Sequence, residues 1–286
     1  MKYRFLILIF ITIFTSKSFS QNFELVGKMR PGEVLIGFAD SLKSVFLDND
    51  SLEFNKGVFL FGFDRDDKGI HKLKLNFLNG KDIVKILKLK NRKYKIQRIN
   101  KIKKKYVSPP KTALNRIAKE RRKLRKARKE IGKDKTPYFL SGFIKPVKSN
   151  RITSVFGSQR ILNGIPKNPH NGLDIAAPLG TPVYAAASGI VRFTGKNFYY
   201  NGNFILLDHG QGLNSIYLHL SKILVKTGNR VQKGQKIGEI GTTGRSTGPH
   251  LHWGVQWFSK RIDPESLLHL NISKLRAHIK TIYSNH

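Results

Sequence analysis

The chain has 286 residues, and 53 Lys or Arg against 18 Asp or Glu give it a formal charge of +35. This length fits about two domains, and an apolar content of 40% is enough for folded cores, so the chain is not a disordered polycation. The absence of cysteine excludes disulfides, thiolate zinc fingers, iron–sulfur clusters and cysteine nucleophiles. The charge indicates an anionic partner, which leaves nucleic acid, a membrane surface and an acidic polymer open.

Residues 1–20 predict a secretory signal peptide. Lys2 and Arg4 precede the apolar run Phe5–Phe14, and Ser18 and Ser20 have the spacing of a cleavage site. An apolar run of this length forms a helix of about 15 Å, half of a bilayer core, so no transmembrane span is expected in the mature chain. We therefore expect an exported protein of the periplasm, the cell envelope or the medium. Export argues against nucleic acid as the partner.

Residues 21–97 are expected to form a β module. Short apolar runs alternate with turn signals, and Asn79-Gly80 predicts a tight hairpin between two of them. The expected strands are Val34–Phe38, Val45–Leu47, Val58–Phe63, Lys72–Phe77 and Ile83–Leu89. Several short strands at this spacing predict an Ig-like β-sandwich, and nothing in the module resembles a catalytic cluster.

Residues 98–137 are interpreted as a basic helical linker. Residues 81–140 carry 24 basic and 4 acidic side chains, a net charge of +20. A helix is expected from 112 to 131, after Ser108-Pro109-Pro110 and before Gly132. One narrow apolar stripe runs along it, formed by Leu114, Ile117, Leu124, Ala127 and Ile131.

Two interpretations of this linker remain open. The stripe could dock on a neighbouring domain while the cationic face is simply solvated. Alternatively, residues 81–140 could hold the protein on anionic envelope polymers or lipid headgroups. Nucleic acid is the weakest candidate, because no cluster of base-stacking aromatic side chains accompanies the charge.

The candidate chemistry lies further along the chain, in histidines. His170 and Asp174 are four residues apart and could share a metal ion if the chain bends at Gly172. His250 and His252 would point to one face of an extended strand. In Ile216-Tyr217-Leu218-His219-Leu220, strand alternation places Tyr217 and His219 on one face and the aliphatic residues on the other. His209 is interpreted as structural.

These weak signals are stronger together. Two His and one Asp make the three-ligand set of a catalytic zinc site, which leaves a fourth position for water. Zinc lowers the pKa of its water from about 15.7 to about 7, and a nearby imidazole can take and return the proton.

From about residue 143 to residue 268 the sequence resembles the lysostaphin/LytM-type zinc metallopeptidases, which cut peptide bonds in peptidoglycan. The matching segments are Ser154-Val155-Phe156-Gly157, His170–Asp174, Gly180–Val183, Leu207–Gly210, Tyr217–Ser221, Gly228–Gly234 and Gly244–His252. Trp253-Gly254-Val255 departs from the family, where many members have Phe-Glu-Val.

The resemblance implies a role for each matching residue. His170, Asp174 and His252 match the ligands of one Zn²⁺ ion, and His219 and His250 match the two catalytic histidines that assist the water. It also implies an antiparallel β domain (a duplicated hybrid motif) with an open groove over the metal. The upstream segments Phe61–Asp66 and Tyr94–Ile99 resemble an Ig-like module found before the peptidase in some envelope members.

We therefore expect a mainly β protein. It would consist of a signal peptide (1–20), an Ig-like module (21–97), a basic linker (98–137), a zinc metallopeptidase domain (138–270) and a C-terminal tail (271–286). The expected function is zinc-dependent hydrolysis of peptidoglycan crosslinks. The alternative is a non-catalytic LytM-like regulator that activates another cell-wall hydrolase, although members of that kind typically lose metal ligands, and all three are matched here.

Overall fold

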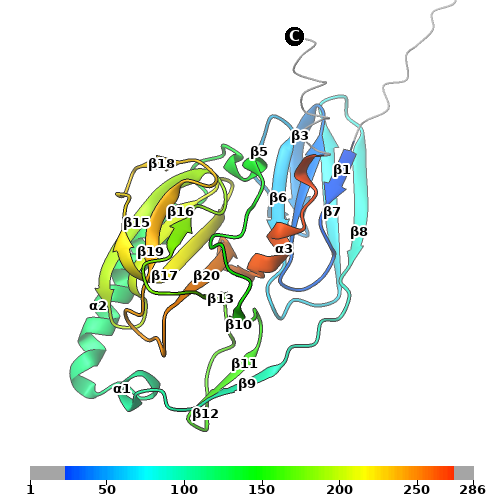
Figure 1. Cartoon of the computed structure of the whole chain (residues 1–286). Coiled ribbons are helices and arrows are strands. Elements are labelled where there is room, and N and C mark those ends of the chain that lie inside the picture. Colours follow the sequence, from blue (N-terminus) through cyan, green and yellow to red (C-terminus); the bar gives the residue numbers. More distant parts are fainter. Residues whose placement is uncertain (1–22, 274–286) are drawn as a thin grey trace, which may run out of the picture.

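The structure is a computed structural model that describes residues 23–273. The expected signal peptide and residues 274–286 of the expected tail lie outside the described residues. The fold is mainly β, as expected, with the strand-rich peptidase region beside a smaller β module (Figure 1). Within residues 23–273, none of the helices combines the length and the apolar character that a bilayer crossing requires.

The N-terminal module consists of two four-stranded antiparallel sheets. The order in the first sheet is β1 (Phe23–Val26), β2 (Val34–Ala39), β6 (Val58–Gly62) and β5 (Phe54–Asn55). The order in the second is β4 (Asp50–Ser51), β3 (Leu42–Leu47), β7 (Ile70–Phe77) and β8 (Asp82–Lys88). The β7–β8 hairpin turns at Asn79-Gly80, as predicted, and Gly80 has the positive φ of 79° that glycine permits in such a turn. All five expected strands are present, whereas an Ig-like topology stays a prediction.

The linker is part of the peptidase side of the molecule. β9 (Ile96–Ile99) pairs in parallel with β11 (Gln159–Leu162), which also pairs with β12 (Ile165–Pro166). α1 (Lys104–Val107) and the long helix α2 (Lys111–Arg128) follow. α2 begins directly after Pro110, close to the predicted start, and ends three residues before the predicted end.

The stripe on α2 docks on the peptidase sheet. Leu124 and Ala127 pack against a cluster that includes Phe204 and Leu206, and Ile117 is buried. Leu114, at the start of the stripe, is 48% exposed. The docking interpretation of the linker therefore describes the stripe from Ile117 onward, and most of the cationic residues of α2 are exposed.

A ten-stranded sheet carries the peptidase region. Its main path runs β10 (Ile152–Ser154), β13 (Leu173–Ala176), β20 (His250–Trp257), β17 (Leu213–Ile223), β16 (Gly202–Asp208), β15 (Gly189–Phe198) and β18 (Arg230–Val231). Branching from this path are β19 (Lys236–Ile240), β14 (Pro182–Tyr184) and β21 (Lys260–Ile262). The short helices η1 (Tyr138–Ser141) and α3 (Pro264–Leu268) complete the region.

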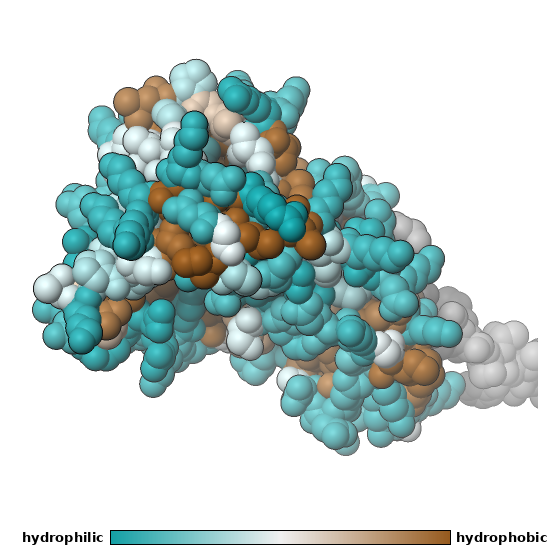
Figure 2. Space-filling model, turned by 90° about the horizontal axis from the view of Figure 1, so that it is seen from below, coloured by the Kyte–Doolittle hydropathy of each residue, from teal (hydrophilic) through white to brown (hydrophobic). Residues whose placement is uncertain are grey.

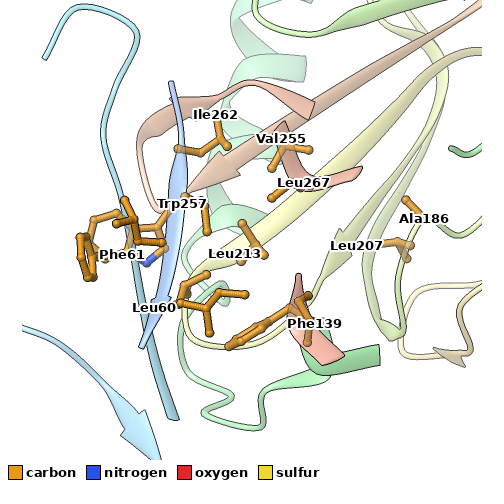
Figure 3. Packing of buried hydrophobic residues seen from close by; sticks show 14 of the residues in the cluster. Leu60, Phe61, Phe139, Ala186, Leu207, Leu213, Val255, Trp257, Ile262 and Leu267 are labelled. Carbon is orange, nitrogen blue, oxygen red and sulfur yellow. The ribbon is translucent and has the colours of Figure 1, made fainter. Parts of the chain in front are cut away.

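The module and the peptidase region share one hydrophobic core. Leu60 and Phe61 of β6 belong to the same buried cluster as Trp257 and Ile262 (Figure 3). A side chain at Gly62 would meet Ile262 at 2.7 Å, so the missing side chain lets the two parts approach closely. Polar contacts also join the two parts. Gln211 Nε2 donates a hydrogen bond of 3.0 Å to the Val58 carbonyl. Lys260 forms an ion pair with Asp67 at 2.9 Å, and Arg92 forms one with Asp263.

Candidate metal centre and groove

Two neighbouring strands bring Asp174 and His252 face to face. β13 and β20 are antiparallel, and their register pairs Asp174 directly with His252. His170 lies just before β13, and the chain bends between it and Asp174 at Gly172, as the sequence suggests. A side chain at Gly172 would come within 2.7 Å of His252 Nε2 and 2.6 Å of the Trp253 carbonyl, so only glycine fits there.

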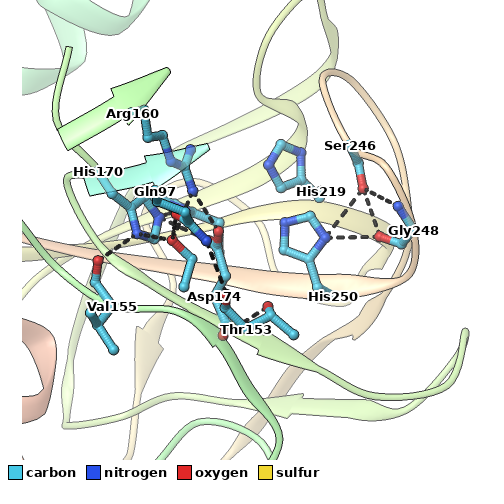
Figure 4. Close-up of polar contacts among 12 residues, drawn as sticks. Gln97, Thr153, Val155, Arg160, His170, Asp174, His219, Ser246, Gly248 and His250 are labelled. Carbon is cyan, nitrogen blue, oxygen red and sulfur yellow. Dashed lines mark hydrogen bonds and ion pairs between the residues drawn. The ribbon is translucent and has the colours of Figure 1, made fainter. Parts of the chain in front are cut away.

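Three ligand atoms converge at this point (Figure 4). His170 Nε2 lies 3.0 Å from Asp174 Oδ1 and 3.0 Å from His252 Nδ1, and the latter two atoms are 2.7 Å apart. Two ligands at about 2.0–2.1 Å from one tetrahedral zinc are separated by roughly 3.3 Å. The cluster thus has nearly the size that a bound zinc requires.

Hydrogen bonds fix the tautomer of His170. Its Nδ1 lies 3.0 Å from the Val155 carbonyl oxygen, which can only accept, and 2.8 Å from Ser154 Oγ. The Ser154 hydroxyl donates to Gln97 Oε1 at 2.6 Å and accepts from the imidazole. His170 Nδ1 therefore carries the proton, and its Nε2 lone pair points at a carboxylate oxygen. A cation between them would accept the lone pair of His170 Nε2 and a lone pair of the carboxylate oxygen, so the residues fit a metal ion.

Arg160 holds the other oxygen of the carboxylate. Its Nη2 donates to Asp174 Oδ2 at 2.7 Å, which leaves Oδ1 for the cluster. Burial alone would raise the pKa of Asp174, but His170 and His252 hold it well below its usual range. Burial lowers the pKa of His252 to about 4, so its imidazole is neutral at neutral pH. An ionised carboxylate and neutral imidazoles are the forms that bind zinc.

His219 reaches the site through a β-bulge. Asn203 of β16 pairs with Leu220 of β17, and Ile205 pairs with Tyr217, so β17 has one extra residue between these two pairs. His219 lies in this stretch and has a φ of +66°. The predicted alternation is therefore wrong at this position. Tyr217 is fully buried in the main core, whereas His219 lies on the groove face beside Leu218. Simple period-two alternation cannot detect an inserted residue.

His219 and His250 lie side by side, and in both rings Nε2 is the nitrogen that is free to accept a hydrogen bond. Their ring centroids are 4.9 Å apart. His219 Nδ1 donates to the Thr243 carbonyl at 2.8 Å and His250 Nδ1 to the Gly248 carbonyl at 2.8 Å, so both Nε2 atoms keep a lone pair. Burial, followed by the neighbouring imidazoles, lowers the pKa of His219 to about 3. At neutral pH His219 is a hydrogen-bond acceptor at Nε2.

All five predicted site residues line one groove of about 650 Å³. One wall comes from the linker, through Ile99, Ile102, Leu124 and Arg128. His209, interpreted as structural, lies elsewhere in the core, where its two nitrogens contact the Ser188 carbonyl and Ser215 Oγ, both at 2.8 Å.

The sequence did not reveal several residues of the site. Arg160 and Gln97 act on the cluster through Asp174 and Ser154, and neither stands in a recognisable spacing with the histidines. Arg128 is hidden among the many basic residues of the linker. Gln97 carried no signal either, because Ile96-Gln97-Arg98-Ile99 does not alternate polar and apolar residues, and the partner strand of β9 could not be known.

Comparison with known proteins agrees with this geometry. Residues 168–264 match the family described as Peptidase family M23. The chain is 51% identical over 111 residues to the peptidoglycan DD-endopeptidase ShyA of Vibrio cholerae, covering 38% of this chain and 25% of that protein. It is 40% identical over 124 residues to the DD-carboxypeptidase/endopeptidase Mpg of Neisseria meningitidis, covering 43% of this chain and 28% of that protein. The match thus spans only about a quarter of these curated relatives.

A solved structure matches over most of the chain. The crystal structure from Pseudomonas aeruginosa that is described as a peptidase M23 has a TM-score of 0.61 and is 30% identical. It covers 84% of this chain and 95% of its own, so the likeness includes the β module and the linker as well as the peptidase region. On this match and that of residues 168–264, the chain belongs to peptidase family M23.

Proposed function

We propose that the protein is an exported, zinc-dependent endopeptidase that hydrolyses peptide crosslinks of peptidoglycan. The observation that carries the proposal is the convergence of His170 Nε2, Asp174 Oδ1 and His252 Nδ1 within 2.7–3.0 Å, beside two further imidazoles in one groove. The name of ShyA supports peptidoglycan as the substrate, and the names of ShyA and Mpg support a D,D-peptide bond as the bond that is cut.

In this proposal His170, Asp174 and His252 hold the zinc ion, which lowers the pKa of water and polarises the scissile carbonyl. Arg160 orients the Asp174 carboxylate through a hydrogen bond to Oδ2. His170 is held in its ligand tautomer by Ser154 and Val155.

His219 and His250 would handle protons. Each has Nδ1–H committed to a backbone carbonyl and a lone pair at Nε2. One Nε2 can take the proton of the attacking water, and an imidazolium can then deliver a proton to the departing amide nitrogen or stabilise the developing negative charge. The two rings are equivalent in this respect, so both are assigned to this work.

The proposal is tested by digesting purified peptidoglycan with the full chain and analysing the products by mass spectrometry. Crosslinked dimers should decrease, and monomers should appear with the mass of one added water per cut. Binding to the wall without any cleaved crosslink, by folded and zinc-loaded protein, would contradict the proposal and favour the regulator.

We also propose that the cationic face of the linker holds the enzyme on its anionic substrate. Arg121, Arg122, Lys123, Arg125 and Lys126 are all exposed on α2. Figure 2 views the molecule from the side on which α1, β9 and β12 lie in Figure 1, and hydrophilic side chains cover most of that face. A stretch of charge +20 is attracted to a polyanion at low ionic strength.

A further inference from the structure

The groove extends well beyond the metal cluster, along β17 and β20. These strands pair Leu218 with His252, Ile216 with Gly254 and Asn214 with Gln256. Alternate residues of β20 face the main core, where Trp253, Val255 and Trp257 are buried. His252, Gly254 and Gln256 therefore face the opposite side of the sheet, and of these three His252 lines the groove. From His252 to Gln256 the strand advances about 13 Å, at about 3.3 Å per residue.

Two arginines stand at the far end of this track. Arg261 of β21 pairs with Gln256 in the sheet. Arg128, the last residue of α2, donates from Nη1 to Asn214 Oδ1 at 3.0 Å, and Asn214 pairs with Gln256 in turn. Both arginines line the same groove as His170, Asp174 and His252.

Neither guanidinium has an ion-pair partner among residues 23–273. Burial, together with the charge of Arg261, lowers the pKa of Arg128 to about 10. Burial also lowers the pKa of Arg261, and the charge of Asp64 opposes that effect. The Asp64 carboxylate bonds the backbone N–H of Arg261 at 3.1 Å. Two adjacent, partly desolvated guanidinium groups are costly where neither forms an ion pair within the described residues and only the charge of Asp64 is known to favour Arg261, so an anionic ligand would relieve that cost.

The groove between these arginines and the cluster has the shape and charge for an extended acidic chain. Asp174 is the only acidic residue among those that line it, and Arg160 already pairs with it. Gly254 lies midway, where a side chain would stand 3.0 Å from Ile216 Cγ2 and 3.5 Å from His252 Nε2. The Asn171 carbonyl would stand 3.2 Å from the same side chain, so glycine lets these three residues pack closely over the strand.

We propose that Arg128 and Arg261 form a carboxylate-binding subsite that selects acidic peptides, in the same groove as the metal cluster. Paired guanidinium groups suit this ligand because each can offer two parallel N–H donors to a carboxylate. This inference rests on the proposed endopeptidase function and names its substrate class. It also gives the linker a part in specificity, because Arg128 comes from α2.

The test compares one crosslinked peptide with free carboxylates to the same peptide with those groups converted to carboxamides. With the zinc-loaded full chain, kcat/KM should favour the free acid by about tenfold to a hundredfold, as expected for hydrogen bonds to charged groups. Arg128→Gln and Arg261→Gln should each remove most of this preference, because kcat/KM for the free acid falls much more than kcat/KM for the carboxamide. Arg128→Lys should retain part of it, because the charge remains and the planar fork is lost.

The matched control is Arg122→Gln, which removes one charge from the exposed face of α2 and should keep the full preference. A second readout does not depend on turnover: fluorescence anisotropy of the labelled peptides with chelator-treated, metal-free full chain should show the same preference and the same losses. An unchanged preference in both arginine variants, or no preference in the wild type by anisotropy, would overturn the subsite. If anisotropy shows tighter binding of the free-acid peptide than of the carboxamide but neither peptide is hydrolysed, the proposed function is contradicted and the subsite is still supported.

Discussion

At the scale of single residues, hydrogen bonds to backbone carbonyls decide which nitrogen of each imidazole is available. The Val155, Thr243 and Gly248 carbonyls each take an Nδ1–H, from His170, His219 and His250. The sequence predicted that these residues meet, through the family motifs. It could not predict their tautomers, because the accepting carbonyls belong to loops whose positions depend on the whole fold.

His209 gives a prediction on stability. Burial lowers the pKa of His209 from 6.5 to about 4. Between these pH values the unfolded chain binds a proton at His209, whereas the folded protein does not. Stability is therefore complete above about pH 6.5 and falls as the pH is lowered from 6.5 to 4, by about 3 kcal/mol in total from this group.

Urea unfolding at pH 7 and pH 5 measures this effect. His209→Gln should be less stable than the wild type at pH 7 but should lose less stability on going to pH 5. His219 and His252 titrate in the same direction and remain in both proteins, so the comparison isolates His209. An equal loss in the two proteins would show that His209 is not the group responsible.

At the scale of elements, the local pattern of apolar residues was enough to predict the strands of the module and the long helix. It was not enough to predict the β-bulge or the pairing of distant strands. The apolar runs of the module and the stripe of α2 are visible in the sequence. The bulge that turns His219 into the groove is not, because it depends on the register between β16 and β17. The pairing of β9 with β11 joins segments about sixty residues apart, and no local pattern specifies such a partner.

The bend between His170 and Asp174 gives a prediction at this scale. Gly172→Ala would place a methyl group 2.7 Å from His252 Nε2 and 2.6 Å from the Trp253 carbonyl, so the His252 ring must move. Zinc affinity should fall by roughly 10–100-fold, the range seen when groups that support a metal ligand are changed. Competition with a chromophoric chelator measures it.

Gly248→Ala is the matched control, because nothing lies within 4 Å of the added methyl group. Its zinc affinity should equal that of the wild type. If Gly172→Ala also binds zinc as tightly as the wild type, then the close packing at Gly172 does not position His252.

At the scale of the whole molecule, the sequence suggested separate segments, and the structure shows how closely they are joined. The β module and the peptidase region share a core through Leu60, Phe61, Trp257 and Ile262. The linker supplies a groove wall, and β9 at its junction with the module supplies a sheet strand and Gln97, which bonds Ser154 beside the metal cluster. The sequence could not predict this contact, because an apolar residue that packs against another domain has the same pattern in the sequence as one that packs inside its own domain.

The proposed wall contact of the linker predicts salt dependence. Binding of metal-free full chain to purified sacculi should weaken steeply as salt rises from about 0.05 M to 1 M, because the Debye length shrinks to about 3 Å. A variant with Arg121, Arg122 and Lys123 changed to Gln should bind less and show a shallower dependence. Binding that is the same at low and molar salt would contradict an electrostatic contact.

The most direct test of the central claim measures zinc content and sacculus hydrolysis on the same preparations of wild-type, His170→Ala and His269→Ala protein. His269 is exposed and outside the groove, so its variant is the matched control. We predict about one zinc per chain and release of soluble peptide fragments for the wild type and the control, and neither for His170→Ala with unchanged circular dichroism. Hydrolysis by His170→Ala at the wild-type rate, or folded wild-type protein that neither binds zinc nor cuts sacculi, would contradict the account.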